Sequence, residues 1–102
     1  MNINEMKKSA TRASTLMKAL SNETRLMLLC QMNEGERSVS ELADNLDLRP
    51  SSVSQQLALL RKDGLVQTRR SNQTIYYSLS GDEAKGVIST LYQLYCSDEA
   101  GT

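Results

Sequence analysis

The chain has 102 residues, enough for one domain with one core, and its 39% hydrophobic and 24% charged residues are ordinary for a soluble globular protein. No apolar run approaches the roughly 20 residues that span a bilayer, and the polar N-terminus lacks the apolar region of a signal peptide, so we expect a cytoplasmic protein with no membrane partner. The net charge is zero, which by itself argues against a nucleic-acid partner, although the charges are unevenly placed along the chain.

Two helices are predicted in the first third of the chain. The first covers about residues 3–20, because apolar residues recur every three or four positions, at Ile3, Met6, Ala10, Ala13, Met17 and Leu20. Ser21 or Asn22 can cap the second helix, which runs through residues 25–32 and is apolar on most sides. We therefore expect the second helix at the centre of the core, with Gly35 near its C-terminal end.

A helix-turn-helix is predicted over about residues 38–62. Ser38 and Glu41 fit a capping box, with Ser at the N-cap and Glu three residues later. A tight turn over residues 47–49 follows, and Pro50 suits the first position of the next helix. Apolar residues of both helices are expected to face the core: Leu42, Ala43, Leu46, Val53, Leu57 and Leu60.

A β-hairpin and a last helix complete the predicted fold. Residues 65–70 and 74–79 are rich in β-branched and aromatic residues and flank Ser71-Asn72-Gln73, which predicts a hairpin, or wing, over about residues 65–79. The last helix covers about residues 82–96, and its apolar side carries Val87, Ile88, Leu91, Leu94 and Tyr95. The order α-α-α-α-β-β-α predicts a mainly α fold with a small β-hairpin (α+β): a winged helix-turn-helix, as a single domain over residues 1–102.

This arrangement predicts binding to double-stranded DNA. The second helix of the motif would enter the major groove, where Ser, Gln and Arg side chains pair with base edges, and the hairpin would follow the backbone or the minor groove. Residues 49–70 carry a net charge of +4, which favours contact with phosphate. The alternative is a small helical protein whose polar helix faces water. The predicted DNA-binding residues are Ser51, Ser52, Ser54, Gln55, Gln56, Arg61, Arg69, Arg70, Asn72 and Gln73.

The chain has two cysteines, Cys30 and Cys96, on two different predicted helices, and it has no histidine. On its apolar helix, Cys30 taken alone is more often a small core residue, whereas Cys96 lies near a helix end and is expected to be reachable. Metal sites in small regulators usually combine several Cys, His and carboxylate ligands. The residues therefore favour a redox-sensing pair with no metal and no cofactor. A disulfide needs Cα atoms roughly 4.4–6.8 Å apart, and the sequence leaves that separation open.

Four segments resemble the ArsR/SmtB family of dimeric bacterial repressors: residues 20–26 (LSNETRL), 40–43 (SELA), 53–57 (VSQQL) and 60–66 (LRKDGLV). The resemblance covers about residues 12–96. Within the family, the surroundings of both cysteines and residues 73–77 (QTIYY) are similar to the sulfide- and redox-responsive branch that includes BigR, SqrR and HlyU. Metal-sensing members often carry Glu-Leu-Cys-x-Cys where this chain has ELADN at residues 41–45, and their other metal site uses His, so neither metal site is expected here.

The resemblance implies a homodimeric repressor that binds a near-palindromic operator, with residues 3–20 and 82–96 at the two-fold interface. It also implies that the two thiols lie close within one subunit. A small oxidant or a sulfane-sulfur species would link them, directly or through extra sulfur atoms, and lower the operator affinity. Two alternatives stay open: an activator or anti-silencer like HlyU with no thiol switch, and a thiol oxidoreductase. The chain has no Cys-x-x-Cys, no histidine base and no βαβ pattern, so we expect no enzyme and no catalytic residue.

Overall fold

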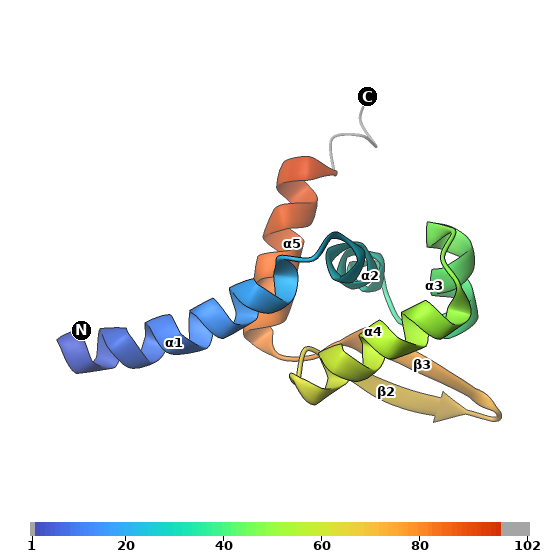
Figure 1. Ribbon diagram of the computed structural model, residues 1–102, viewed down its shortest axis with the longest axis horizontal. Coiled ribbons are helices and arrows are strands. Elements are labelled where there is room, and N and C mark those ends of the chain that lie inside the picture. Colours follow the sequence, from blue (N-terminus) through green and yellow to red (C-terminus); the bar gives the residue numbers. More distant parts are fainter. Residues whose placement is uncertain (1, 97–102) are drawn as a thin grey trace.

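The computed structural model describes residues 2–96, so residues 1 and 97–102 of the predicted domain lie outside the described residues. The elements follow in the order α1 (Ile3–Leu20), α2 (Glu23–Asn33), β1 (Arg37–Ser38), α3 (Val39–Leu46), α4 (Pro50–Lys62), β2 (Val66–Ser71), β3 (Thr74–Leu79) and α5 (Asp82–Tyr95). The strands form one small sheet beside the helices (Figure 1). The predicted α+β fold, a winged helix-turn-helix, is confirmed.

α2 lies at the centre of the fold, as its apolar sequence predicts. Its Leu28 and Leu29 are fully buried, and α3, α4 and α5 all contact it (Figure 1). The surrounding helices contribute Leu42, Leu57 and Ile88, which are also fully buried. Burying one such side chain stabilises a protein by about 1.5–3 kcal/mol relative to leaving it exposed. This shared core therefore holds α3 and α4 in place on α2.

The helix-turn-helix forms where it is predicted. Ser38 Oγ accepts a hydrogen bond from the Glu41 N–H at 3.2 Å, and Glu41 Oε1 accepts one from the Ser38 N–H at 2.8 Å, so the predicted capping box begins α3. Asp47 ends α3 in the left-handed conformation, with φ 55°. Pro50 is the first residue of α4, and the two helices pack against each other.

The sheet has one strand more than the sequence predicts. β1 pairs with β3, with Arg37 opposite Tyr77 and Ser38 opposite Tyr76, and the strand order is β1-β3-β2. A strand this short has no alternation to recognise, and it forms because β3 lies beside it. The predicted hairpin is present, and Asn72 in its turn has φ 57°, a left-handed conformation that Asn adopts more readily than most residues.

α1 projects away from the rest of the fold (Figure 1). Only Ala19 and Leu20 of α1 are buried, so the apolar stripe predicted for residues 3–20 is largely uncovered within one chain. Large apolar side chains are exposed on both α1 and α5: Ile3 by 63%, Met6 by 51%, Met17 by 60%, Leu94 by 69% and Tyr95 by 74%. Among residues 2–96, no helix combines the length and the apolar character required to cross a membrane.

Candidate nucleic-acid interface and thiol pair

The outer face of α4 carries half of the predicted DNA-binding residues. Val53, Leu57 and Leu60 are fully buried and hold the inner face of α4 against the core. Within residues 2–96, no hydrogen bond or ion pair occupies the side chains of Gln55 and Arg61. Hydroxyl, carboxamide and guanidinium groups on such a helix are suited to base edges and phosphates in a major groove. The exposed predicted residues of α4 are Ser51, Ser52, Ser54, Gln55 and Arg61.

Gln56 lies apart from this exposed face. It is half-buried, and its Oε1 accepts a hydrogen bond from Arg25 Nη1 of α2 at 3.5 Å. Arg25 Nε in turn donates to the backbone oxygen of Ala19 at 2.9 Å. The structure thus brings Gln56 to the junction of α1, α2 and α4, away from its neighbour Gln55.

Arg69 and Arg70 of the wing have different surroundings although they are adjacent. Arg69 Nε donates to Glu36 Oε2 at 3.1 Å, its Nη2 donates to Glu36 Oε1, and its guanidinium lies 5.0 Å from the centre of the Tyr76 ring. The hydrogen bond from Arg69 holds the pKa of the Glu36 carboxyl below its usual range. Arg70 is exposed and has no ion pair with any described residue. The wing therefore presents Arg70, whereas Arg69 fastens β2 to the segment before β1.

A groove of about 650 Å³ separates the helix-turn-helix from the wing. Ser40 of α3 and Ser54 of α4 line one side, and Gln73 of the wing lines the other. Asn72, the residue before Gln73 in the turn, is exposed. The fold thus brings two of the predicted residues, Ser54 of α4 and Gln73 of the wing turn, to one groove, although they are far apart in the sequence.

Cys30 and Cys96 are free thiols, one in α2 and one at the C-cap of α5, and these two helices pack together. Both residues are half-buried, and Cys30 contacts the core. Burial raises the pKa of the Cys30 thiol, and the negative charge of Cys96 raises it further. The two thiols thus lie on helices that pack together, and the charge of one acts on the other. Residues 2–96 contain no group of three or more Cys, His, Asp or Glu side chains that could hold a metal ion.

A tyrosine and a glutamate that sequence patterns did not single out lie one helical turn from the thiols. The Tyr92 hydroxyl donates a hydrogen bond to Glu34 Oε2 at 2.9 Å. That hydrogen bond raises the pKa of Tyr92, and the negative charges of Glu34, Cys96 and Cys30 raise it further. Glu34 follows Cys30 by four residues and Tyr92 precedes Cys96 by four, so each shares a helix face with its cysteine. This spacing is visible in the sequence, but the partner across the helices is not.

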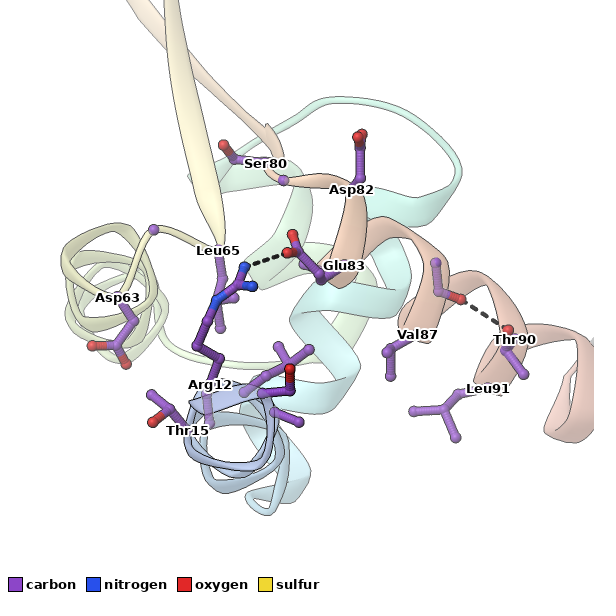
Figure 2. Close-up of a pocket in the computed structure, with 18 residues that line it drawn as sticks. Arg12, Thr15, Asp63, Leu65, Ser80, Asp82, Glu83, Val87, Thr90 and Leu91 are labelled. Atoms are coloured by element: carbon purple, nitrogen blue, oxygen red, sulfur yellow. Dashed lines mark hydrogen bonds and ion pairs between the residues drawn. The ribbon is translucent and has the colours of Figure 1, made fainter. Parts of the chain in front are cut away.

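A pocket of about 820 Å³ lies between α1, the connection from α4 to β2, and α5 (Figure 2). Leu16 of α1 and Leu91 of α5 contribute apolar surface to it. Arg12 reaches from α1 to the start of α5, where its Nη2 pairs with Glu83 Oε2 at 2.5 Å (Figure 2). Neither cysteine lines the pocket, so it is separate from the thiol pair.

Comparisons with known proteins agree with this geometry. Residues 22–68 match the family described as bacterial regulatory protein, arsR family. The chain is 49% identical over 96 residues to the transcriptional activator HlyU of Vibrio cholerae, covering 94% of this chain and 89% of that protein. It is 45% identical over 94 residues to the biofilm growth-associated repressor of Agrobacterium fabrum, covering 92% and 80%. The structure of reduced HlyU from Vibrio cholerae matches with a TM-score of 0.88 at 47% identity, covering 93% of this chain and 100% of that one. The chain therefore belongs to the ArsR family of bacterial regulatory proteins, and it is a DNA-binding transcriptional regulator.

Proposed function

We propose that this regulator is a homodimeric repressor that leaves a near-palindromic operator when Cys30 and Cys96 become linked. The observation that carries the proposal is the packing of α2 on α5, the two helices that bear Cys30 and Cys96. α3 and α4 both contact α2, so a covalent link from α2 to α5 acts on the support of the DNA-reading helix. The protein would act on cytoplasmic, nucleoid DNA, in a compartment where thiols stay reduced until a signal oxidises them.

The exposed apolar side chains of α1 and α5 support the homodimer. Several large apolar side chains exposed on two helices of a small protein indicate an interaction site. A two-fold interface built from α1 and α5 would cover Met17 and Leu94, which are 60% and 69% exposed in one chain. Two α4 helices would then lie about one DNA turn, ~34 Å, apart, which requires an operator with matching half-sites.

An organic persulfide can act as the oxidant that links Cys30 to Cys96. The Cys96 thiolate attacks the outer sulfur of the persulfide, the sulfur–sulfur bond of the donor breaks, and a thiol leaves. The Cys30 thiolate then attacks Cys96 Sγ and releases hydrosulfide, so the two cysteines are oxidised and the sulfane sulfur is reduced. Further donors would leave extra sulfur atoms in the bridge. Hydrogen peroxide would accept the same two electrons and be reduced to two molecules of water. We assign the second attack to Cys30 because its raised pKa lowers its thiolate fraction.

Gel-shift titrations with the wild type, Cys30→Ser and Cys96→Ser, before and after a persulfide donor or peroxide, test the switch. The reduced proteins should bind the operator alike. Only the treated wild type should lose affinity, by about 5–150-fold, the range typical of coupled sites. Mass spectrometry of the treated proteins distinguishes a disulfide from a bridge with extra sulfur. Release of DNA from either treated single mutant contradicts a two-cysteine switch and points to modification of one thiol.

Gln55→Ala tests base reading by α4. Loss of a good base contact should weaken operator binding by about 1–3 kcal/mol and leave random DNA unaffected. Gln56→Ala is the matched comparison, because the Gln56 carboxamide is bound to Arg25, and its effect should be smaller. Equal losses on operator and random DNA for Gln55→Ala would remove the base-reading role.

A second candidate function is an activator or anti-silencer without a thiol switch, since one relative at 49% identity is the transcriptional activator HlyU. An activator of this kind should raise transcription from a reporter promoter, and Cys30→Ser should leave that activity unchanged with or without the persulfide donor. A repressor should lower transcription until the donor is added.

A further inference from the structure

The Glu34 carboxylate binds side chains of two different elements, α5 and β1. Its Oε2 accepts from the Tyr92 hydroxyl of α5 at 2.9 Å, and its Oε1 pairs with Arg37 Nη2 of β1 at 3.2 Å. Glu34 is the C-cap of α2, so it lies where this core helix ends and the segment before β1 begins. One side chain therefore contacts the thiol-bearing helix on one side and the sheet on the other.

Arg37 connects this carboxylate to the helix-turn-helix. In the sheet, the backbone of Arg37 lies opposite Tyr77 of β3, and the next residue, Ser38, is the N-cap of α3. The Arg37 side chain is 24% exposed, and its Nε is buried with no hydrogen-bond partner among the described residues. The guanidinium is thus held by its other nitrogens, and within residues 2–96 its ion pair is with Glu34.

The thiols and the Glu34–Tyr92 hydrogen bond are successive contacts of the same pair of helices. Glu34 lies one turn after Cys30 on α2, and Tyr92 lies one turn before Cys96 on α5. The backbone N–H of Cys96 also donates to the Tyr92 carbonyl at 2.8 Å, so Cys96 is hydrogen-bonded to the helical turn that begins at Tyr92. A link between the sulfurs therefore acts on the same end of α5 that bears the hydrogen bond from Tyr92 to Glu34.

We propose that Glu34 is a positioning residue that couples the thiol pair to the DNA-binding elements, with Tyr92 on one side and Arg37 on the other. This inference rests on the proposed thiol switch and names the contacts that transmit it. When linking of the thiols displaces the end of α5, the hydrogen bond from Tyr92 to Glu34 changes. The ion pair between Glu34 and Arg37 then changes as well, which alters the position of β1 and of the start of α3. Glu36, in the same segment, binds Arg69 of β2, so the wing is connected to the same point.

Tyr92→Phe removes only the hydroxyl, and Tyr95→Phe is the matched control on the same helix. The Tyr95 hydroxyl makes no hydrogen bond with a described residue, and this change keeps the exposed ring that the proposed dimer interface would cover. Each variant is linked with the persulfide donor, the extent of linking is measured by mass spectrometry, and operator affinity is measured before and after. Tyr92→Phe should link fully and bind the operator normally when reduced, but its loss of affinity on linking should shrink by roughly five-fold. Tyr95→Phe should respond like the wild type.

Glu34→Gln tests the other side of the coupling. The carboxamide oxygen can still accept from Tyr92, but the charge that holds Arg37 is gone. The loss of operator affinity on linking should shrink as it does for Tyr92→Phe. A wild-type response in fully linked Tyr92→Phe and Glu34→Gln would overturn the role of Glu34 while leaving the two-cysteine switch intact.

Amide hydrogen exchange on the reduced protein gives a readout that needs no thiol chemistry. Tyr92→Phe should speed exchange at the Ser38 and Glu41 amides, which form the capping box of α3, and Tyr95→Phe should not. If linking leaves the operator affinity of the wild type unchanged, the proposed switch fails, and this exchange still decides the coupling. Equal exchange in the two variants would overturn the connection from α5 to α3.

Discussion

Cys30 combines two properties that a thiol sensor must balance. It is half-buried and contacts the core, which keeps the thiol protonated, yet its reaction with an oxidant or sulfur donor needs the thiolate. The neighbouring charge of Cys96 raises the pKa of Cys30 in the same direction as burial. At neutral pH the pair is therefore expected to stay reduced until a reactive donor arrives, and the response should strengthen as the pH rises.

The first prediction concerns the reactivity of Cys30. In Cys96→Ser, the rate of Cys30 alkylation by iodoacetamide should rise with pH, with a midpoint above that of the unfolded chain in urea. The larger cause of the raised pKa, burial, remains in this variant, while the smaller one, the charge of Cys96, is removed. The rate is measured by mass spectrometry across a pH series. A midpoint at or below that of the unfolded chain would show that burial does not control this thiol.

The second prediction concerns the adjacent arginines of the wing. Arg70→Ala should weaken binding to all DNA sequences alike and reduce the slope of the salt dependence by about 1, because Arg70 is exposed and has no ion pair among the described residues. Arg69→Ala should change that slope less, because Arg69 is held by Glu36 and lies over Tyr76. Fluorescence anisotropy with random DNA at several salt concentrations measures both slopes. A larger change for Arg69→Ala than for Arg70→Ala would reverse these roles.

At the scale of single elements, α3 depends on its first turn. The helix covers Val39–Leu46, too short to be stable alone, and its capping box and the buried Leu42 and Ala43 compensate. The same Ser38 pairs with Tyr76 in the sheet, so the start of α3 is fixed to β3 as well. α4, in contrast, has no side-chain hydrogen bond at its N-cap Arg49 and begins at Pro50. The orientation of α4 therefore depends on the core and on the turn from α3.

The third prediction tests that cap. Ser38→Ala should lower the free energy of unfolding by about 1 kcal/mol, since it removes the oxygen that accepts from the Glu41 N–H. Ser40→Ala is the control on the same helix, because Ser40 is exposed and makes no hydrogen bond with a described residue through its side chain. Urea unfolding followed by circular dichroism gives both values. Equal stability of the two variants would contradict the role of the capping box.

At the scale of the whole molecule, the chain is elongated, with extents of 48 × 36 × 22 Å, because α1 projects from the core. An isolated projecting helix with exposed Ile3, Met6 and Met17 lacks the packing that normally stabilises helices in proteins. The proposed two-fold interface supplies that packing. It also sets the distance between the two α4 helices, so dimer geometry and operator spacing are linked.

The fourth prediction tests this interface. Met17→Glu should shift the protein from dimer towards monomer and weaken operator binding, because it places a charge on a side chain that is 60% exposed in one chain and buried in the proposed dimer. Thr11→Glu, on the other side of α1, adds the same charge and should leave the dimer intact. Analytical ultracentrifugation at several concentrations measures the association. Equal association of the two variants would place the interface elsewhere.

The sequence by itself determined the features that depend on neighbours a few residues away. The capping box at Ser38, the turn before Pro50, the inward Val53, Leu57 and Leu60, and the hairpin all follow from local hydrogen bonds and periodicity. The family was also recognisable, because its motifs lie in these same local segments. The physical reason is that helix and turn preferences act over one or two helical turns, so the residues that determine them are close together in the sequence.

Only the tertiary structure decided which distant residues meet. β1 exists because β3 lies beside it, and Gln56 turns to Arg25 across 31 positions of the chain. Arg69 meets Glu36 across 33 positions, and Tyr92 meets Glu34 across 58. No local pattern encodes such pairs, because they depend on how α2 packs against α4, α5 and the sheet. The thiol pair belongs to both levels: the two cysteines and their helices were evident in the sequence, but their mutual influence arises only where α5 packs on α2.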